Sequence, residues 1–131
     1  MSLNVLVVDD SAVMRAMVIK TLRAAGLPIG QTFQAANGLE GLEVLAENWV
    51  DVVFADINMP VMGGEEMIEK IRANPTWSDL PIIVISTEGS KARIECLRAK
   101  CTEFVHKPFA PEIVRDVIAN LTGVHHEQQT G

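Results

Sequence analysis

Three short, almost wholly apolar runs do most to limit the folds open to this chain. They are residues 3–8 (LNVLVV), 51–55 (DVVFA) and 81–85 (PIIVI). Runs of this length, rich in Val and Ile and bounded by turn residues, are typical of strands buried on both faces. Such strands occur where helices cover both sides of a parallel sheet, so the runs predict an α/β protein.

Two more polar strands and five helices complete the alternation. The strands are predicted at 31–36 and 102–106, and their polarity places them at the sheet edges. Apolar residues recur at helical spacing in the five intervening and following segments, at residues 13–25, 39–45, 64–71, 94–98 and 113–121. The pattern predicts a doubly wound (βα)5 sandwich of three layers, flavodoxin-like, with a parallel five-stranded sheet of order 2-1-3-4-5.

Length and composition exclude several classes of protein. The chain has 131 residues, and we expect one domain over residues 1–123 followed by a flexible C-terminal tail at 124–131. A net charge of −6 argues against a basic nucleic-acid surface. The sequence contains no run of the ~20 apolar residues that span a membrane, no signal peptide, and only two cysteines. We therefore expect a cytoplasmic protein that binds neither nucleic acid nor membrane.

Charged and hydroxyl side chains follow four of the five predicted strands. Asp9 and Asp10 follow the first strand, Asp56 the third, Ser86 the fourth and Lys107 the fifth. In a sheet of this order, ligands bind beyond the carboxyl ends of the strands, where the strand order reverses. Three carboxylates at one edge repel each other unless a cation lies between them. Oxygen ligands of this kind favour Mg²⁺, so the sequence predicts a magnesium site.

A carboxylate beside a bound metal ion can act as a nucleophile. Asp56 would attack phosphorus and form an aspartyl phosphate, while Lys107 and the Ser86 hydroxyl would contact the transferred oxygens. Each residue alone also has an ordinary structural interpretation, because Asp and Ser cap helices and turns and most lysines are solvated. The combination at one sheet edge favours the site.

With these residues in place, the sequence resembles a bacterial two-component response-regulator receiver domain, of the single-domain chemotaxis-regulator type. The resemblance covers residues 3–123. The motifs that carry it are Asp9-Asp10, Asp56 with Met59-Pro60 and Gly63-Gly64, Ser86-Thr87, and Lys107-Pro108-Phe109.

The resemblance implies a role for each residue of the site. Asp56 would be the phosphoacceptor, which receives its phosphoryl group from the phosphohistidine of a sensor histidine kinase or a phosphotransfer protein. Asp10 would bind Mg²⁺ (or Mn²⁺) directly, Asp9 mainly through water, and Asn58 through its backbone carbonyl. Lys107 would contact the phosphoryl group.

The resemblance also implies a switch. Ser86 would move toward the phosphoryl group, and the aromatic residue Phe104 would turn inward. Phe104 stands where the chemotaxis regulator has Tyr, so a partner contact through a tyrosine hydroxyl is not expected. Asn58 and Glu88 match the pair that hints at a short phosphoryl lifetime, although Glu88 also suits the start of a helix.

Output is expected through the face formed by the fourth helix, the fifth strand and the fifth helix, at about residues 90–121. The protein would act in a chemotaxis-type pathway or a phosphorelay, and would catalyse only its own phosphorylation and dephosphorylation. Four basic residues on this face form either a docking patch or an ordinary solvated surface: Lys91, Arg93, Arg98 and Lys100.

Two other functions are open to a sequence of this kind. A phosphatase of the haloacid-dehalogenase type has Asp-x-Asp after the first strand, with the nucleophile there, whereas this chain has Asp9-Asp10-Ser11. A binding module that is not phosphorylated would lack Asp10, Asp56 or Lys107, and all three are present.

Overall fold

Strands and helices alternate along the whole described chain. The computed structural model describes residues 2–87, 90–99, 101, 103–107 and 110–122. The elements in chain order are β1 (Leu3–Val8), α1 (Ala12–Ala24), β2 (Ile29–Ala35), α2 (Gly38–Glu47), β3 (Val52–Ala55), α3 (Gly64–Ala73), the 3-10 turn η1 (Pro75–Trp77), β4 (Ile82–Ser86), α4 (Lys91–Arg98), β5 (Glu103–His106) and α5 (Pro111–Thr122).

The five strands form one parallel sheet of order β2-β1-β3-β4-β5. The predicted order is thereby confirmed, with the two polar strands at the edges. The pairing of β1 with β3 sets Val8 opposite Ala55, so both strands end at the same level. The residues that follow them, Asp9 and Asp56, therefore leave the sheet side by side.

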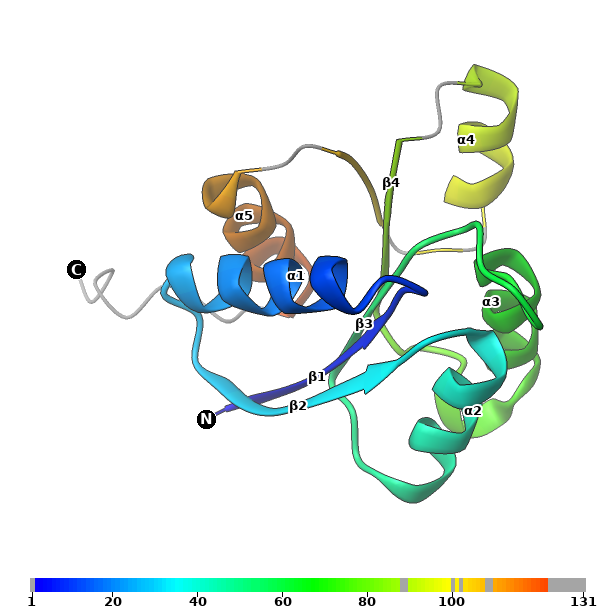
Figure 1. The fold of residues 1–131 in the computed structure, drawn as a ribbon, viewed down its shortest axis with the longest axis horizontal. Coiled ribbons are helices and arrows are strands. Elements are labelled where there is room, and N and C mark those ends of the chain that lie inside the picture. Colours follow the sequence, from blue (N-terminus) through cyan, green and yellow to red (C-terminus); the bar gives the residue numbers. More distant parts are fainter. Residues whose placement is uncertain (1, 88–89, 100, 102, 108–109, 123–131) are drawn as a thin grey trace.

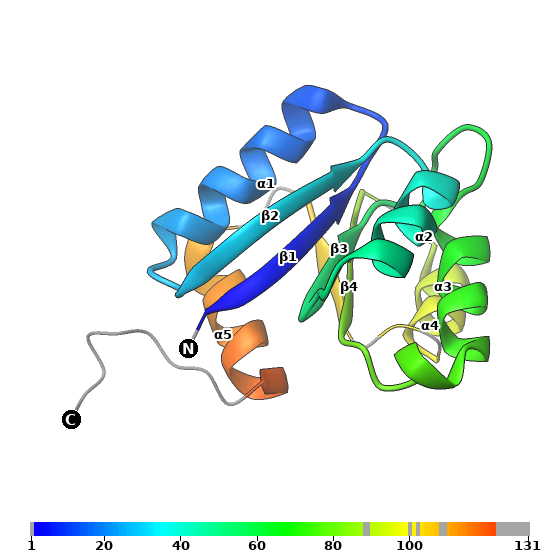
Figure 2. The same ribbon diagram turned by 90° about the horizontal axis from the view of Figure 1, so that it is seen from below.

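Helices cover both faces of the sheet, which gives the predicted three layers. Figure 2 shows α1 and α5 on one face and α2, α3 and α4 on the other, and Figure 1 shows the same division from another side. Each face of the sheet has its own hydrophobic core, and alternate residues of β1 pack into one or the other. Leu6 and Val8 pack toward α2 and α3, whereas Val5 and Val7 pack toward α1 and α5. The apolar runs are thus buried on both faces, as the sequence predicted. None of the helices in the described ranges is long and apolar enough to cross a membrane.

Some boundaries differ from the prediction. β2 begins at Ile29 rather than at residue 31, because Ile29 pairs with Leu3 and the strand continues through Gly30 with a local shift of register. The 3-10 turn η1 was not predicted; Asn74, whose side chain accepts from Thr76 N–H, caps it. Thr102 and the expected tail at 124–131 lie outside the described residues.

The loop after β3 is fixed at both of its ends. The Gly64 N–H donates to the Ile57 carbonyl (2.8 Å), and the Gly38 N–H at the start of α2 donates to the Met62 carbonyl (2.8 Å). Between them, Val61 has a positive φ of 67° inside a three-residue turn closed by Met62 N–H and Pro60 C=O. A β-branched residue in this conformation is strained.

Glycine is required at position 64, because an added Cβ would collide with the carbonyl oxygen of Asp56. We expect Gly64→Ala to lower the free energy of unfolding by about 2 kcal/mol, the usual effect of overpacking a fixed backbone. Urea denaturation measures this. Gly63→Ala is the matched control, since its Cβ would lie 3.0 Å from the Ile57 oxygen and needs only a small shift. Equal stability of the two variants would contradict the prediction.

Candidate functional site

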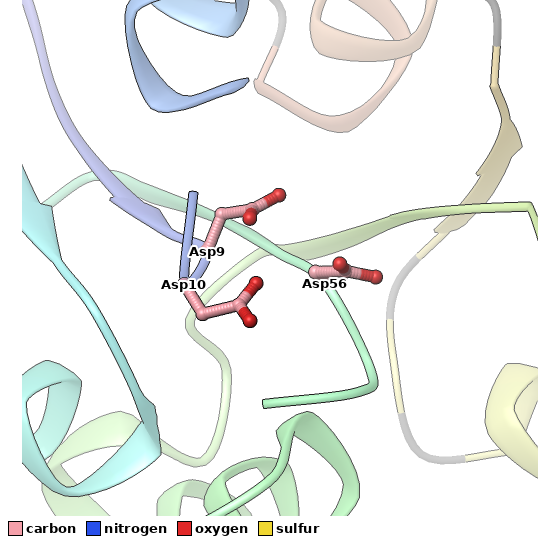
Figure 3. A group of neighbouring side chains, drawn as sticks. All are labelled: Asp9, Asp10 and Asp56. Atoms are coloured by element: carbon pink, nitrogen blue, oxygen red, sulfur yellow. The ribbon is translucent and has the colours of Figure 1, made fainter. Parts of the chain in front are cut away.

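The carboxyl ends of four strands bring five predicted site residues to one edge of the sheet. Asp9 and Asp10 follow β1, Asp56 follows β3, Ser86 ends β4 and Lys107 follows β5. Carboxylate oxygens of the three aspartates lie within 4.8 Å of one another. Figure 3 shows the three side chains gathered at the ends of β1 and β3.

Asp9 is buried at the base of this group, with 4% of its surface exposed. Its Oδ1 accepts from the Ser11 N–H (2.9 Å), and its backbone N–H donates to the Ala35 carbonyl (3.0 Å). The Arg15 guanidinium donates to the Asp9 carbonyl through Nη1 (2.6 Å). These bonds fix the turn between β1 and α1.

The helix cap that the sequence left open is now assigned. Ser11 is the N-cap of α1, and its hydroxyl oxygen accepts from the Met14 N–H (3.3 Å). Neither Asp9 nor Asp10 caps this helix. The interpretation of these two carboxylates as ordinary helix caps is therefore wrong.

Asp56 is half-buried and is anchored by its own backbone. Its N–H donates to the Val8 carbonyl (3.0 Å), which extends the pairing of β3 with β1 by one residue. One carboxylate oxygen, Oδ1, accepts from the Ile57 N–H (2.7 Å). The other, Oδ2, lies 3.7 Å from the ammonium of Lys107. Asp56 thus makes a local turn contact and still presents an oxygen to the site.

Lys107 reaches into the site from the edge strand. Its Nζ lies 3.5 Å from Asp9 Oδ2 as well as 3.7 Å from Asp56 Oδ2, and only 16% of its side chain is exposed. Its N–H donates to the Ser86 carbonyl (3.0 Å). Lys107 is therefore not an ordinary solvated lysine. One ammonium beside the three carboxylates of Asp9, Asp10 and Asp56 leaves two negative charges uncompensated.

Electrostatics at Asp9 favour an additional cation. Burial is the largest influence and raises the pKa of Asp9, and the negative charge of Asp56 raises it further. The Ser11 N–H and Lys107 act in the opposite direction but do not overcome burial. A divalent, oxygen-preferring ion would balance the two residual charges, so the donor set fits Mg²⁺.

Ser86, Phe104 and Asn58 are the other predicted site residues that the structure describes. Ser86 is 3% exposed, at the end of β4 and opposite His106 of β5. Phe104 is 4% exposed, and its ring packs edge-on to His106 with centroids 4.9 Å apart. Asn58 is exposed, two residues after Asp56. Four residues from the expected motifs and basic patch lie outside the described ranges: Glu88, Lys100, Pro108 and Phe109.

Arg15 is a site neighbour that the sequence did not indicate. Besides the Asp9 carbonyl, it contacts Gln34 of β2 through Nε (3.0 Å). Its position on α1, one turn after Ser11, suits an ordinary surface residue equally well. Only the fold reveals that it braces the turn carrying Asp9.

The raised pKa of Asp9 predicts a pH-dependent effect on stability in chelator-treated protein. The folded state holds the Asp9 proton more tightly than the unfolded chain, so protonation of Asp9 stabilises the fold. This stabilisation is full below pH 3.8, the ordinary pKa of an Asp side chain in the unfolded state, and is lost as the pH rises through the pKa of Asp9 in the folded state. Asp9→Asn, which keeps the acceptor for Ser11, should therefore increase the free energy of unfolding near neutral pH by on the order of 1 kcal/mol.

Urea unfolding at several pH values tests this expectation. The gain from Asp9→Asn should shrink as the pH falls toward 3.8. Asp116→Asn, at a carboxylate whose side chain is 70% exposed, is the control and should show little change. A gain that is constant with pH, or a loss of stability at neutral pH, would contradict the assignment.

Comparisons with known proteins agree with this geometry. The sequence profile of the response regulator receiver domain matches residues 5–119. A chemotaxis protein CheY homolog of Campylobacter jejuni is 37% identical over 123 residues, which cover 92% of this chain and 93% of the relative. Chemotaxis protein CheY1 of Helicobacter pylori is 35% identical, covering 94% and 99%.

A solved structure supports the same relationship. The chemotaxis response regulator CheY4 of Vibrio cholerae superimposes with a TM-score of 0.80 at 34% identity, covering 92% of this chain and 99% of CheY4. The family match spans most of the chain, and the fold and the arrangement of acidic residues agree with it. The chain therefore belongs to the response regulator receiver domain family.

Proposed function

We propose that Asp56 accepts a phosphoryl group from the phosphohistidine of a sensor histidine kinase or a phosphotransfer protein, and that the phosphorylated chain signals to a partner protein. The observation that carries this proposal is the position of Asp56 Oδ2, at the open edge of the sheet and beside the Lys107 ammonium. A nucleophile of this kind needs nearby positive charge, since the incoming group is an anion.

The metal ion in this proposal is Mg²⁺, or Mn²⁺ in its place. Asp10 and Asp56 would bind it through their carboxylates, Asp9 mainly through water, and Asn58 through its backbone carbonyl. When bound, the ion supplies the positive charge that lets an anionic phosphoryl group approach three carboxylates.

The transfer itself is a displacement at phosphorus. An Asp56 carboxylate oxygen forms the new O–P bond while the N–P bond to the donor histidine breaks, and the bonding electron pair returns to the imidazole nitrogen. Lys107 contacts one oxygen of the transferred group, and the Ser86 hydroxyl approaches another. Because Asp56 Oδ2 and the Lys107 ammonium already lie 3.7 Å apart, little movement of these two groups accompanies the step.

Signalling in this proposal follows a population shift. The Ser86 hydroxyl moves toward the phosphoryl group and stabilises the inward position of Phe104, which the ring already occupies in this structure (4% exposed), so that one conformer of the chain is favoured. Phe104 lies on β5, where it pairs with Val84 of β4. Ser86 is two residues further along β4 and pairs with His106. A motion of Ser86 is thus transmitted to β5 over a short distance.

We assign output to the face formed by α4, β5 and α5. A groove of about 550 Å³ lies there, lined by β5 and by residues of α5 that include Ile113, which is 49% exposed. Two of the basic residues expected to form a docking patch are already in ion pairs: Arg93 with Glu65 (2.7 Å) and Arg98 with Glu103 (3.1 Å). The apolar groove, rather than the basic patch, is therefore the better-supported docking feature.

The relatives favour a chemotaxis-type pathway. The relatives from Campylobacter jejuni and Helicobacter pylori named above are both chemotaxis proteins. We propose a signalling protein that catalyses only its own phosphorylation and dephosphorylation, with Asn58 and Glu88 setting the phosphoryl lifetime. Its receiver domain would comprise residues 1–123, with residues 124–131 outside the domain.

Intact-mass measurement tests the phosphoacceptor. Incubation with Mg²⁺ and acetyl phosphate should add the mass of one phosphoryl group, and Asp56→Asn should abolish the addition. Asp116→Asn, on the exposed surface of α5, should leave it unchanged. No gain in the unaltered protein, or a gain that survives Asp56→Asn, would overturn the proposal.

Magnesium binding gives a second, separate test. Asp10→Asn should weaken the Mg²⁺ affinity at least about tenfold, which corresponds to about 1.4 kcal/mol, since it removes a carboxylate ligand from an exposed position. Titration calorimetry of the unphosphorylated protein measures this. Asp116→Asn is again the control, and equal affinities for Asp10→Asn and the unaltered protein would remove Asp10 from the site.

A further inference from the structure

A second concave surface lies at the opposite end of the sheet from the aspartates. This aromatic groove, of about 530 Å³, is lined by residues 45–51 and 75–81. Asp51 immediately precedes β3 and Pro81 precedes β4, so the groove opens at the amino ends of these strands. Asp56 lies beyond the carboxyl end of β3, roughly 13 Å of strand away.

The first wall of the aromatic groove, residues 45–51, presents a tryptophan, Trp49, that is fixed in place. Trp49 is 76% exposed. Its indole Nε1–H donates to Asp51 Oδ1 (3.0 Å), and its carbonyl accepts from the Asn4 side chain (3.1 Å). A large exposed aromatic that is held in place loses little freedom when it is covered, and such residues dominate binding surfaces.

The second wall, residues 75–81, is held in place by Arg72 of α3. Its Nη1 donates to the carbonyls of Leu80 (2.7 Å), Trp77 (3.3 Å) and Ser78 (3.3 Å). The Trp77 side chain is half-buried and packs against the core on the α2–α3 side of the sheet. The groove is therefore a built surface with a Trp residue in each wall.

The charge of the aromatic groove is negative. The residues that line it include Glu47, Asp51 and Asp79, and no Lys, Arg or His is among them. The carboxylate of Asp51 is occupied by Trp49 and by the Asn4 N–H (2.7 Å). Glu47 and Asp79 are exposed. Arg72, partly buried behind the second wall with its guanidinium on backbone carbonyls, also attracts Asp79 electrostatically, but one cation against Glu47, Asp51 and Asp79 leaves the mouth of the groove negative.

We propose that the aromatic groove binds an extended segment of a partner protein that carries an Arg or Lys side chain flanked by apolar residues. The faces of Trp49 and Trp77 attract a cation through their π electrons, and Glu47 and Asp79 pair with its charge. The apolar flanks of the segment fill the remaining volume, which lies in the range of ordinary binding sites. This binding does not depend on the proposed phosphorylation of Asp56.

The two tryptophans provide the signal for a direct test. The chain has two Trp and no Tyr, so its tryptophan fluorescence comes entirely from this groove. The probe is an acetylated, amidated pentapeptide Gly-Leu-Arg-Leu-Gly, titrated into the full chain in low salt. We expect a saturable change in emission. The same peptide with Gln in place of Arg should bind at least about tenfold more weakly, and the version with Glu should not bind.

Variants then locate the binding. Asp79→Asn should weaken the Arg peptide at least about threefold, since one of two paired charges is lost. Glu112→Gln, an exposed carboxylate on α5, is the matched control and should have no effect. Trp49→Ala retains Trp77 as the reporter and should weaken binding about tenfold.

Three outcomes would overturn the proposal. They are equal binding of the Arg and Gln peptides, absence of any emission change up to about 5 mM peptide, and equal effects of Asp79→Asn and Glu112→Gln. Sedimentation of the chain alone adds a separate outcome: self-association that Asp79→Asn abolishes would assign the groove to a second copy of this chain rather than to a partner protein.

Discussion

The pairing of β1 with β3 is the constraint on which the site depends. Both strands are buried on both faces, so the register that sets Val8 opposite Ala55 cannot slip without exposing apolar side chains. That register places Asp9 and Asp56 side by side, and the bond from Asp56 N–H to the Val8 carbonyl locks the arrangement. Hydrophobic burial thus holds together like charges that would otherwise separate.

Lys107 links this charged centre to the edge of the sheet. Its ammonium lies between Asp9 and Asp56, and its backbone N–H bonds to the Ser86 carbonyl. A change of charge at Asp56 therefore changes the electrostatic force on Lys107. Through Lys107 it acts on the ends of both β4 and β5, the strands that carry the proposed switch residues. The same cation that limits repulsion in the unphosphorylated chain also connects the acceptor to the proposed output face.

The sequence predicted the features that follow from hydrophobic pattern and strand order. The three apolar runs indicated the central strands, and the order then placed Asp9, Asp56 and Lys107 together. It did not predict that β2 begins at Ile29, because Gly30 signals a break in isolation and only pairing with β1 shows that the strand continues. Nor did it indicate Arg15, whose role depends on a backbone carbonyl that becomes its neighbour only in the fold.

The sequence did not predict the aromatic groove for a related reason: its two walls come from loops that are distant in sequence and meet only in the fold. Its walls are tied to Asn4 and Arg72, neither of which belongs to the proposed switch. The α4–β5–α5 face, in contrast, is built from the elements that Ser86 and Phe104 would move. A partner held in the groove would consequently remain bound in both phosphorylation states. Such a tether would raise the effective concentration of any second contact made by the same partner at the switching face.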